Sequence, residues 1–325
     1  MSRQQEYIDA LRENLRIDSV ESCGLYQRGV GSAVIPMAGE GFGYLASKNV
    51  RVYETDAPEL SQRTREIIEA RTPTPKVNNP IPFLRRTWGG EVIPIVREDD
   101  VFELPLYIGT FKDWRGTLPR KDQYDSELIK ADLMTPFNTT AVAVTRDGYF
   151  FAPERSGGRQ SHSSVLCLLN GYRLDRDIAE NTLACHKEIV EEGTGRELER
   201  QSMGCVAFQL NIPLEKVLES RLMGLGVSEP AINDYGYHTL HLARVDLDRQ
   251  EVVDAANEIY GDDKHSRYLR IRDEHVIPFE ADSLVMFANK APEKMAMTQI
   301  PAIWVALANQ FGERHLRSIE GLVRN

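Results

Sequence analysis

The chain has 325 residues, enough for one large domain or two smaller ones with a sizeable hydrophobic core. Hydrophobic residues make up 42% of the sequence and charged residues 27%, which are ordinary values for a soluble globular protein. The formal net charge of −10 argues against nucleic acid or an anionic membrane as the main partner, but it permits a phosphorylated substrate held by a metal ion and local basic side chains.

The four cysteines form no C-x-x-C pair, so neither a zinc ribbon nor a thioredoxin-type motif is expected. No run of about 18 apolar residues is present, and the polar N-terminus has no apolar signal region. We therefore expect a cytoplasmic protein with reduced thiols and no transmembrane helix.

Residues 1–112 are predicted to form a smaller α+β region, whose role the sequence does not reveal. Helical spacing of apolar residues favours the helices, and short apolar runs between glycine and proline favour the strands. The predicted elements are a helix over 2–16, strands over 33–37 and 50–53 with a glycine-rich turn between them, a helix over 60–70, an extended proline-rich connector over 72–82, and strands over 92–96 and 104–108.

An aromatic and basic cluster follows at residues 111–117, which we interpret as a loop. A planar arginine such as Arg115 can pair with phosphate, and a tryptophan such as Trp114 can stack on a base. The simpler alternative, which we favour somewhat, is a loop whose aromatic side chains pack against the second domain. Arg115 and Trp114 are therefore reserve candidates for substrate contact.

A β-hairpin is predicted next, because an Asp147-Gly148 turn lies between apolar runs at 140–145 and 149–156. Arg155 lies at the end of this hairpin, where it either contacts a phosphate or is an ordinary solvated charge. A second short apolar strand over 165–170 leads directly into Gly171.

Residues 171–195 contain a dense group of acidic side chains. On a helix Glu188, Glu191 and Glu192 share one face within about one turn, where their mutual repulsion requires a cation or solvent. Hard divalent cations such as Mg²⁺ prefer oxygen ligands of this kind. The alternative is a solvated acidic face of an amphipathic helix, which is the more common fate of a charge run.

The ends of this helix are also predicted from local signals. Asp177 can act as its N-cap, with Glu180 three residues later closing a capping box. Gly193 and Gly195 follow the acidic residues and can stop the helix.

This stretch resembles the Nudix box, G-x5-E-x7-R-E-U-x-E-E-x-G-U, in which U is a bulky aliphatic residue. Gly171 matches the opening glycine, Asp177 replaces the first glutamate, and Lys187 replaces the arginine of the R-E-U-x-E-E segment at 187–192. The spacer between Asp177 and Lys187 is nine residues rather than seven, and Thr194 stands where the pattern has glycine. The resemblance covers residues 137–310 and is carried by a degenerate box.

The resemblance implies a Nudix-type α/β/α sandwich with a mixed sheet, over residues 113–325. It also implies a hydrolase that cleaves the diphosphate linkage of a nucleoside diphosphate joined to another moiety, such as an NDP-sugar or ADP-ribose. Glu188, Glu191 and Glu192 would then bind Mg²⁺ or Mn²⁺, and one of them, for instance Glu191, would accept a proton from the attacking water. Lys187 would support the helix by ion pairing, and Gly171 would shape the preceding loop. The expected partner is a small-molecule diphosphate, and the N-terminal region would shape its pocket or build a homodimer.

The departures from the box support an alternative function. A catalytically impaired protein on the same fold would bind a nucleotide or a sugar and act as a regulator. Such a protein would keep its ligand affinity when the glutamates are replaced by glutamine.

The remaining elements are predicted from periodicity. In chain order they are a strand over 203–210, a helix over 213–222, a strand over 235–246, a helix over 252–259, a short extended segment over 276–280 and a final helix from residue 298. On the strand over 235–246 the period of two places His238 and His241 on opposite faces, so they are not expected to share a metal ion. Trp304 and Leu307 are expected in the core.

Overall fold

A computed structural model of the chain defines its fold. The described residues are 22–27, 31–38, 41–42, 50–71, 80–84, 97–98, 101–117, 135–155, 169–171, 194–227, 237–258, 269–290 and 299–311. Several predicted elements lie outside these residues, namely those over 2–16, 72–79, 92–96, 165–168 and 177–193. None of the described helices is long and apolar enough to cross a membrane.

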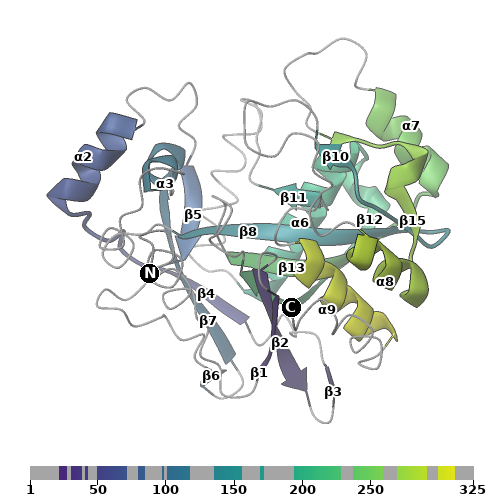
Figure 1. Cartoon of the computed structure of the whole chain (residues 1–325), viewed down its shortest axis with the longest axis horizontal. Coiled ribbons are helices and arrows are strands. Elements are labelled where there is room, and N and C mark those ends of the chain that lie inside the picture. Colours follow the sequence, from purple (N-terminus) through teal and green to yellow (C-terminus); the bar gives the residue numbers. More distant parts are fainter. Residues whose placement is uncertain are drawn as a thin grey trace.

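One mixed sheet organises the described part of the chain, with 13 strands (Figure 1). Its main path runs β1-β2-β12-β13-β8-β5-β7-β4, and β3, β6, β9, β11 and β15 attach beside it. Only β8 with β13 and β4 with β7 are parallel among the described pairs. The strands are β1 (Ser22–Gln27), β2 (Gly31–Ala38), β3 (Gly41–Phe42), β4 (Val50–Glu54), β5 (Pro80–Leu84), β6 (Arg97–Glu98), β7 (Val101–Thr110), β8 (Thr135–Thr145), β9 (Tyr149–Phe151), β11 (Leu169–Gly171), β12 (Val217–Val227), β13 (Tyr237–Val245) and β15 (Val276–Pro278). A separate two-stranded sheet pairs β10 (Glu154–Arg155) with β14 (Leu269–Arg270).

Helices cover both faces of the central strands. The described helices are α2 (Gln62–Arg71), α3 (Phe111–Thr117), α6 (Gly195–Leu210), α7 (Arg249–Glu258), α8 (Ala281–Lys290) and α9 (Gln299–Phe311), with 3₁₀ turns η2 (Leu214–Lys216) and η4 (Asp273–His275). Ala141 and Ala143 of β8 pack in a cluster with α6 and α7, whereas Val142 and Val144 pack in a cluster with α8 and α9. This alternation at period two places an apolar core on each side of the sheet. The coarse α/β class expected from the sequence is therefore confirmed.

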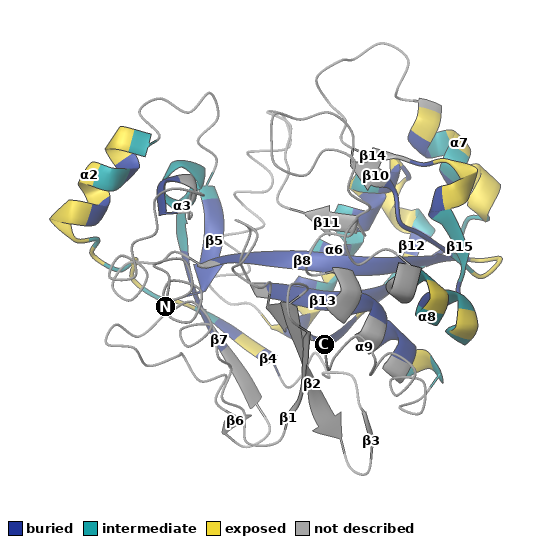
Figure 2. Cartoon of the chain, viewed as in Figure 1, coloured by how far each residue is buried: buried dark blue, intermediate teal, exposed yellow. Residues whose placement is uncertain are grey.

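Strand β8 is the central element of the molecule. Figure 1 shows it crossing from the β4, β5 and β7 side to the β15 side, and Figure 2 shows that its described residues are buried along almost its whole length. It pairs with β13 over nine residues from Phe137 to Thr145, and with β5, β9 and β11 on its other edge. A strand buried on both faces in this way explains the continuous apolar and threonine-rich run in the sequence.

The first part of the chain contributes β4, β5 and β7 to this same sheet. Strand β5 pairs with both β7 and β8, so strands from either side of the predicted boundary at residue 112 are hydrogen bonded together. The boundary itself stays a prediction. The extended connector predicted over 72–82 is wrong at its end, because Pro80 and Pro82 lie inside β5. The chain tolerates them because the pairing of β5 with β8 is confined to Phe83 and Leu84.

The strand predicted over 203–210 is wrong, because these residues form the second half of α6. The sequence contains a capping box at the start of this helix: Thr194 is the N-cap, and the side chain of Glu197 accepts a hydrogen bond from the backbone N–H of Thr194. Leu198, Ser202, Val206 and Leu210 recur every four residues and are all fully buried, as on the inner face of a helix. Gly195 is the first residue of α6, and the preceding helix that it was predicted to stop lies outside the described residues.

The helix predicted over 213–222 is also wrong. One 3₁₀ turn, η2, is followed directly by strand β12. The register of β12 against β13 shifts between Val217 and Glu219 and again between Leu222 and Gly224. Each bulge adds one residue and breaks the period of two that marks a strand.

The predictions for several other described elements are confirmed. Strands β2, β4, β7, β13 and β15 and helices α2, α7 and α9 lie where periodicity placed them. The β8–β9 hairpin has Gly148 at φ 81°, a left-handed conformation that glycine adopts without strain. Leu307 is fully buried, as predicted for the core, whereas the side chain of Trp304 lies outside the described residues. Helix α8 was not predicted.

Candidate functional site

The residues predicted to bind metal and to shape the Nudix-like helix lie outside the described part of the chain, which resumes at Thr194. They are Asp177, Lys187, Glu188, Glu191 and Glu192. The structure does describe the residues at the two ends of this segment, Gly171 and Thr194. These two residues show where the described chain stops before the segment and where it resumes after it.

Gly171 is the last residue of β11 and pairs with Thr139 of β8. The preceding residues, Leu169 and Asn170, pair with Ala141 and Thr140. The segment that contains the predicted site therefore leaves the sheet beside the central strand. A short strand leading into Gly171 is the arrangement predicted from the sequence.

Thr194 fixes the other end of the segment to two elements. It forms an isolated antiparallel bridge with Arg51 of β4, and it is the N-cap of α6. Its Oγ1 accepts a hydrogen bond from the backbone N–H of Arg196 at 3.2 Å, and its own N–H donates to Oε2 of Glu197 at 2.9 Å. Partial burial works to raise the pKa of Glu197, but its hydrogen bonds from Thr194 outweigh this and hold the pKa below the usual value. A fully formed capping box thus defines where α6 begins.

Buried polar side chains are concentrated beside these anchors. Of the twelve buried polar or charged residues in the described part of the chain, eight lie on β8, β12, β13 and α6 around this point: Asn138, Thr139, Thr140, Ser202, Ser220, His238, Thr239 and His241. Buried polar groups cost free energy unless they are hydrogen bonded, so such a concentration at one place needs an explanation.

The two histidines of β13 occupy opposite sides of the sheet. His238 lies 3.1 Å from Oγ1 of Thr140 through its Nδ1 atom, and His241 lies 3.4 Å from Oγ of Ser220. Burial lowers the pKa of His241 to about 3, so its ring is neutral at physiological pH. The sequence predicts opposite faces of the strand for the two histidines but indicates neither Ser202 nor Ser220, because nothing in the sequence pairs them with a histidine.

The substrate candidates outside the box are spread over two places. Trp114 lies in helix α3 rather than in a loop, and it packs on Ile81, Phe83 and Tyr107 of β5 and β7 rather than on the second domain. Arg115 is its neighbour in α3. The helix was missed because seven residues are too few for a clear period.

Arg155 lies in a different part of the fold, in β10. It is paired with Leu269 of β14. The side chains of Arg115 and Arg155 lie outside the described residues, so their predicted phosphate contacts stay predictions.

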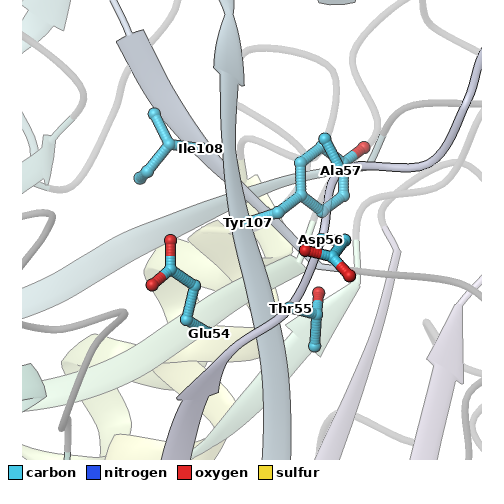
Figure 3. Close-up of a pocket in the computed structure, with 6 residues that line it drawn as sticks. All are labelled: Glu54, Thr55, Asp56, Ala57, Tyr107 and Ile108. Carbon is cyan, nitrogen blue, oxygen red and sulfur yellow. The ribbon is translucent and has the colours of Figure 1, made fainter.

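A cleft that the sequence did not indicate opens at the ends of β4 and β7 (Figure 3). It has a volume of about 580 Å³ and is lined by Glu54, Thr55, Asp56, Ala57, Tyr107 and Ile108. The pairing of β4 with β7 stops at Glu54. The backbone N–H of Thr55 donates a last hydrogen bond to the carbonyl oxygen of Leu106 at 2.8 Å, and the chain then leaves the sheet. The available signal was a pair of acidic residues directly after a predicted strand.

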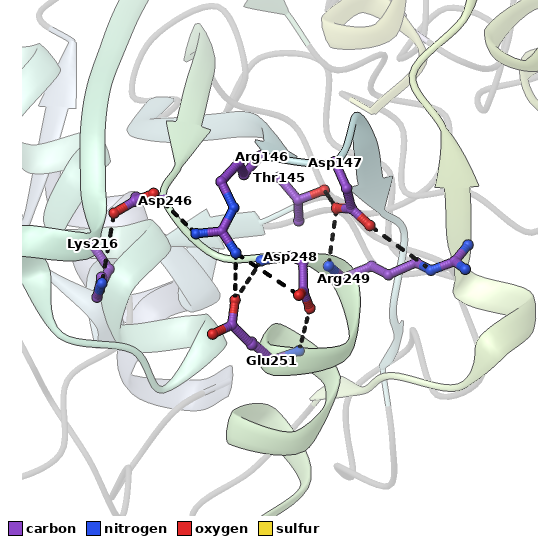
Figure 4. A network of polar contacts seen from close by, with 8 residues as sticks. All are labelled: Thr145, Arg146, Asp147, Lys216, Asp246, Asp248, Arg249 and Glu251. Carbon is purple, nitrogen blue, oxygen red and sulfur yellow. Dashed lines mark hydrogen bonds and ion pairs between the residues drawn. The ribbon is translucent and has the colours of Figure 1, made fainter.

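A surface network at the far end of β8 is structural (Figure 4). Arg146, in the β8–β9 turn, contacts Asp246 at 3.4 Å and Glu251 at 3.2 Å, and Glu251 also forms the capping box of α7 with Asp248. These contacts hold the start of α7 against the hairpin. All of these side chains are 40–56% exposed, so each pair contributes little stability.

Comparison of the chain with protein-family models and with curated proteins finds no match. The fold therefore defines the class only as an open mixed α/β sheet with helices on both faces. Within the described residues, no three His, Cys, Asp or Glu side chains come together as a metal site.

Proposed function

We propose that the chain is a Mg²⁺-dependent hydrolase of the Nudix type, which cleaves the diphosphate linkage of a nucleoside diphosphate joined to another moiety. The observation that carries the proposal is the acidic motif at 187–192, which lies between a strand ending at Gly171 and a helix beginning after Thr194. The motif supplies carboxylate oxygens, the ligands that Mg²⁺ prefers.

Further support comes from the elements around the motif. The β8–β9 hairpin, strand β11 and the final helix α9 occur in the order that the resemblance implies, with helices on both faces of a mixed sheet. Covalent geometry adds a limit: Glu192 precedes Thr194 by two residues, and two consecutive Cα steps span at most about 7.6 Å. The fixed position of Thr194 therefore restricts where a metal site built on Glu192 can lie.

In this proposal each group has a defined task. Glu188, Glu191 and Glu192 hold Mg²⁺, or Mn²⁺ in its place, and Lys187 pairs with an acidic neighbour. When bound, the metal neutralises charge on the diphosphate and polarises the water that attacks phosphorus. Glu191 accepts the proton of that water. Arg155 and Arg115 are the candidates for contacts to phosphate.

The test is hydrolysis by the purified chain with Mg²⁺, using NDP-sugars, ADP-ribose, dinucleotides and nucleoside triphosphates as substrates. We expect release of a nucleoside monophosphate or sugar phosphate, and a loss of kcat/KM on the order of 100-fold or more in Glu191→Gln and Glu192→Gln. Glu274→Gln is the matched control, because that side chain is 66% exposed in an ion pair with Arg272 and lies outside the motif in the sequence. Folded protein without Mg²⁺-dependent turnover on any substrate would refute the proposal.

Calorimetry with ADP-ribose separates the alternative regulatory function from hydrolysis. A binding protein without activity would bind this ligand, and the two glutamine variants would bind it nearly as well as the unmodified chain. The departures of the box at Asp177 and Thr194 are the sequence observations that favour this second function.

A further inference from the structure

Two arginines lie beside Thr194, the residue at which the described chain resumes after the acidic motif. Arg51 of β4 lies opposite Thr194 in the antiparallel bridge, and Arg196 follows Thr194 by two residues in the first turn of α6. Both arginines are exposed. On β4 the neighbours Val50 and Val52 are each 2% exposed, so Arg51 lies on the opposite, open face of the strand. The bridge and the capping box thus fix two basic residues at one point of the chain.

Covalent geometry limits the distance from this point to the predicted metal site. Paired Cα atoms of antiparallel strands lie about 4.5–5.5 Å apart, and two Cα steps span at most about 7.6 Å. The Cα atoms of Arg51 and of Glu192, the last carboxylate of the motif, are therefore at most about 13 Å apart. Arginine and glutamate both have long side chains, so a ligand bound to a metal at Glu192 can be reached by the guanidinium of Arg51.

The guanidinium of Arg196 forms no hydrogen bond or ion pair within the described residues. Its neighbour Glu197 accepts a hydrogen bond from the backbone N–H of Thr194 at 2.9 Å and pairs with Arg200, at 3.9 Å, rather than with Arg196. A guanidinium presents five N–H donors in a planar fork that fits a phosphate group. Arg196 is thus available to bind an anion.

The register of the sheet offers Arg51 a structural role as well. Its partner on the parallel strand β7 is Glu103, and opposite charges at paired positions stabilise a sheet modestly. Such a pair does not involve Arg196. A diphosphate has charged oxygens on two phosphorus atoms, so it can bind one guanidinium at each. Two arginines at one anchored point therefore favour an anion with two charged groups.

We propose that Arg51 and Arg196 together bind the diphosphate of the substrate, in addition to the candidates Arg155 and Arg115. This role rests on the proposed function, whose substrate carries the diphosphate. The diphosphate then receives positive charge from two sources, the metal ion at the acidic motif and the two guanidinium groups beside Thr194. Because Arg51 belongs to β4, the first part of the chain contributes directly to substrate binding.

Calorimetric titration of the full chain with ADP-ribose and Mg²⁺ tests this pair, together with steady-state kinetics on any substrate that is turned over. Arg51→Gln and Arg196→Gln should each raise Kd and KM by about 10- to 100-fold, the factor for losing a hydrogen bond to a charged group, with a smaller change in kcat. Arg200→Gln is the matched control, because it removes the same charge from α6 at a side chain that is 76% exposed and paired with Glu197. This control should leave both constants nearly unchanged.

Two further variants separate ligand contact from stability of the sheet. Arg51→Lys keeps the charge but loses the planar fork, so its affinity should fall between those of the unmodified chain and Arg51→Gln. Glu103→Gln removes the register partner of Arg51 and should lower Tm without a comparable loss of ADP-ribose binding. If Arg51→Gln and Glu103→Gln lower Tm equally and neither changes the affinity, Arg51 serves the sheet alone and the proposal is wrong. A loss of affinity confined to one of the two arginines would also overturn the pair.

The outcomes distinguish this proposal from the proposed hydrolysis. A chain that binds ADP-ribose through both arginines but hydrolyses nothing would support the pair and refute the hydrolase. Hydrolysis with an unchanged KM in both glutamine variants would refute the pair alone. A folded chain that neither binds ADP-ribose nor hydrolyses any substrate would refute both. If Arg51→Gln does not fold, Arg51→Lys and Arg196→Gln still decide the question.

Discussion

Removing the cap of α6 provides a quantitative test of how the segment after the acidic motif is held. In Thr194→Ala the backbone N–H of Arg196 loses its acceptor at 3.2 Å, and Glu197 loses its bond to the hydroxyl. Replacing a threonine N-cap by alanine costs about 1 kcal/mol. At roughly 2.1 cal/mol/K per residue, 325 residues give an unfolding entropy of about 0.7 kcal/mol/K, so Tm should fall by about 1.5 °C.

Because this shift in Tm is small, the assay should also measure the helix itself. Amide hydrogen exchange in the first turn of α6 should accelerate by roughly fivefold, the factor that corresponds to about 1 kcal/mol. Thr194→Ser is the matched control, because serine keeps the hydroxyl and is a good N-cap. Equal exchange rates in the alanine and serine variants would refute the assignment of Thr194 as the cap.

The pH dependence of the same capping box provides a second check. The hydrogen bonds from Thr194 hold the pKa of Glu197 below its ordinary value of 4.5 in the folded protein. A carboxyl group of lowered pKa contributes its stability fully above the unfolded pKa and loses it as the pH falls through the folded pKa. The difference in unfolding free energy between the unmodified chain and Glu197→Gln should therefore be constant above about pH 5 and should shrink below pH 4.5. A difference that grows on acidification would contradict this sign.

Four further substitutions test the packing and the buried histidine. Gly116→Ala should destabilise the protein by about 1–3 kcal/mol in urea unfolding, because the new Cβ would lie 2.7 Å from Cγ1 and 2.8 Å from Cα of Ile68. Gly204→Ala in α6 should stabilise the protein by about 0.5–1 kcal/mol, because its new Cβ would meet nothing within 4 Å. Phe150→Ala should cost about 3–5 kcal/mol, since that ring is 0% exposed at the centre of one core. His241 has a pKa of about 3 in the folded protein against 6.5 in the unfolded chain, so the unfolded state binds more protons between these pH values. The free energy of unfolding should therefore fall by up to about 1.4 kcal/mol per pH unit on acidification below pH 6.5. His241→Phe should lack this component of the pH dependence.

Much of the central sheet could be predicted from the sequence because its strands keep a regular period. β13 alternates without interruption between Tyr237 and Val245, and the hairpin after β8 has an Asp-Gly turn. β12 could not be read in the same way, since its two bulges interrupt the period of two. Helix α6 could have been predicted from its capping box. The predicted strand began at Met203, nine residues after the capping Thr194, and so left the start of the helix out.

The polar interior could not be predicted, for a different physical reason. Ser202, Ser220 and His241 are 18 and 21 residues apart and come from a helix and two strands. A serine in a helix or strand is usually exposed, so only the packing of α6 on the sheet makes these two part of the core. The cleft at Glu54 likewise depends on the residue at which β4 stops pairing with β7. The sequence pattern of one strand does not indicate where its pairing with another strand ends.

The neutrality of His241 limits how the proposed reaction can work. A diphosphate brings negative charge, and the acidic motif brings more, so binding requires positive charge from a metal ion or from basic side chains. His241 on β13 does not supply it, because burial lowers the pKa of its ring to about 3 and removes the charge at any physiological pH. The described part of the sheet centre therefore contributes hydrogen bonds and rigidity rather than charge. If the proposal is right, affinity for ADP-ribose should depend on Mg²⁺, Arg155 and Arg115, and it should not change with the pH between 5 and 8 through His241.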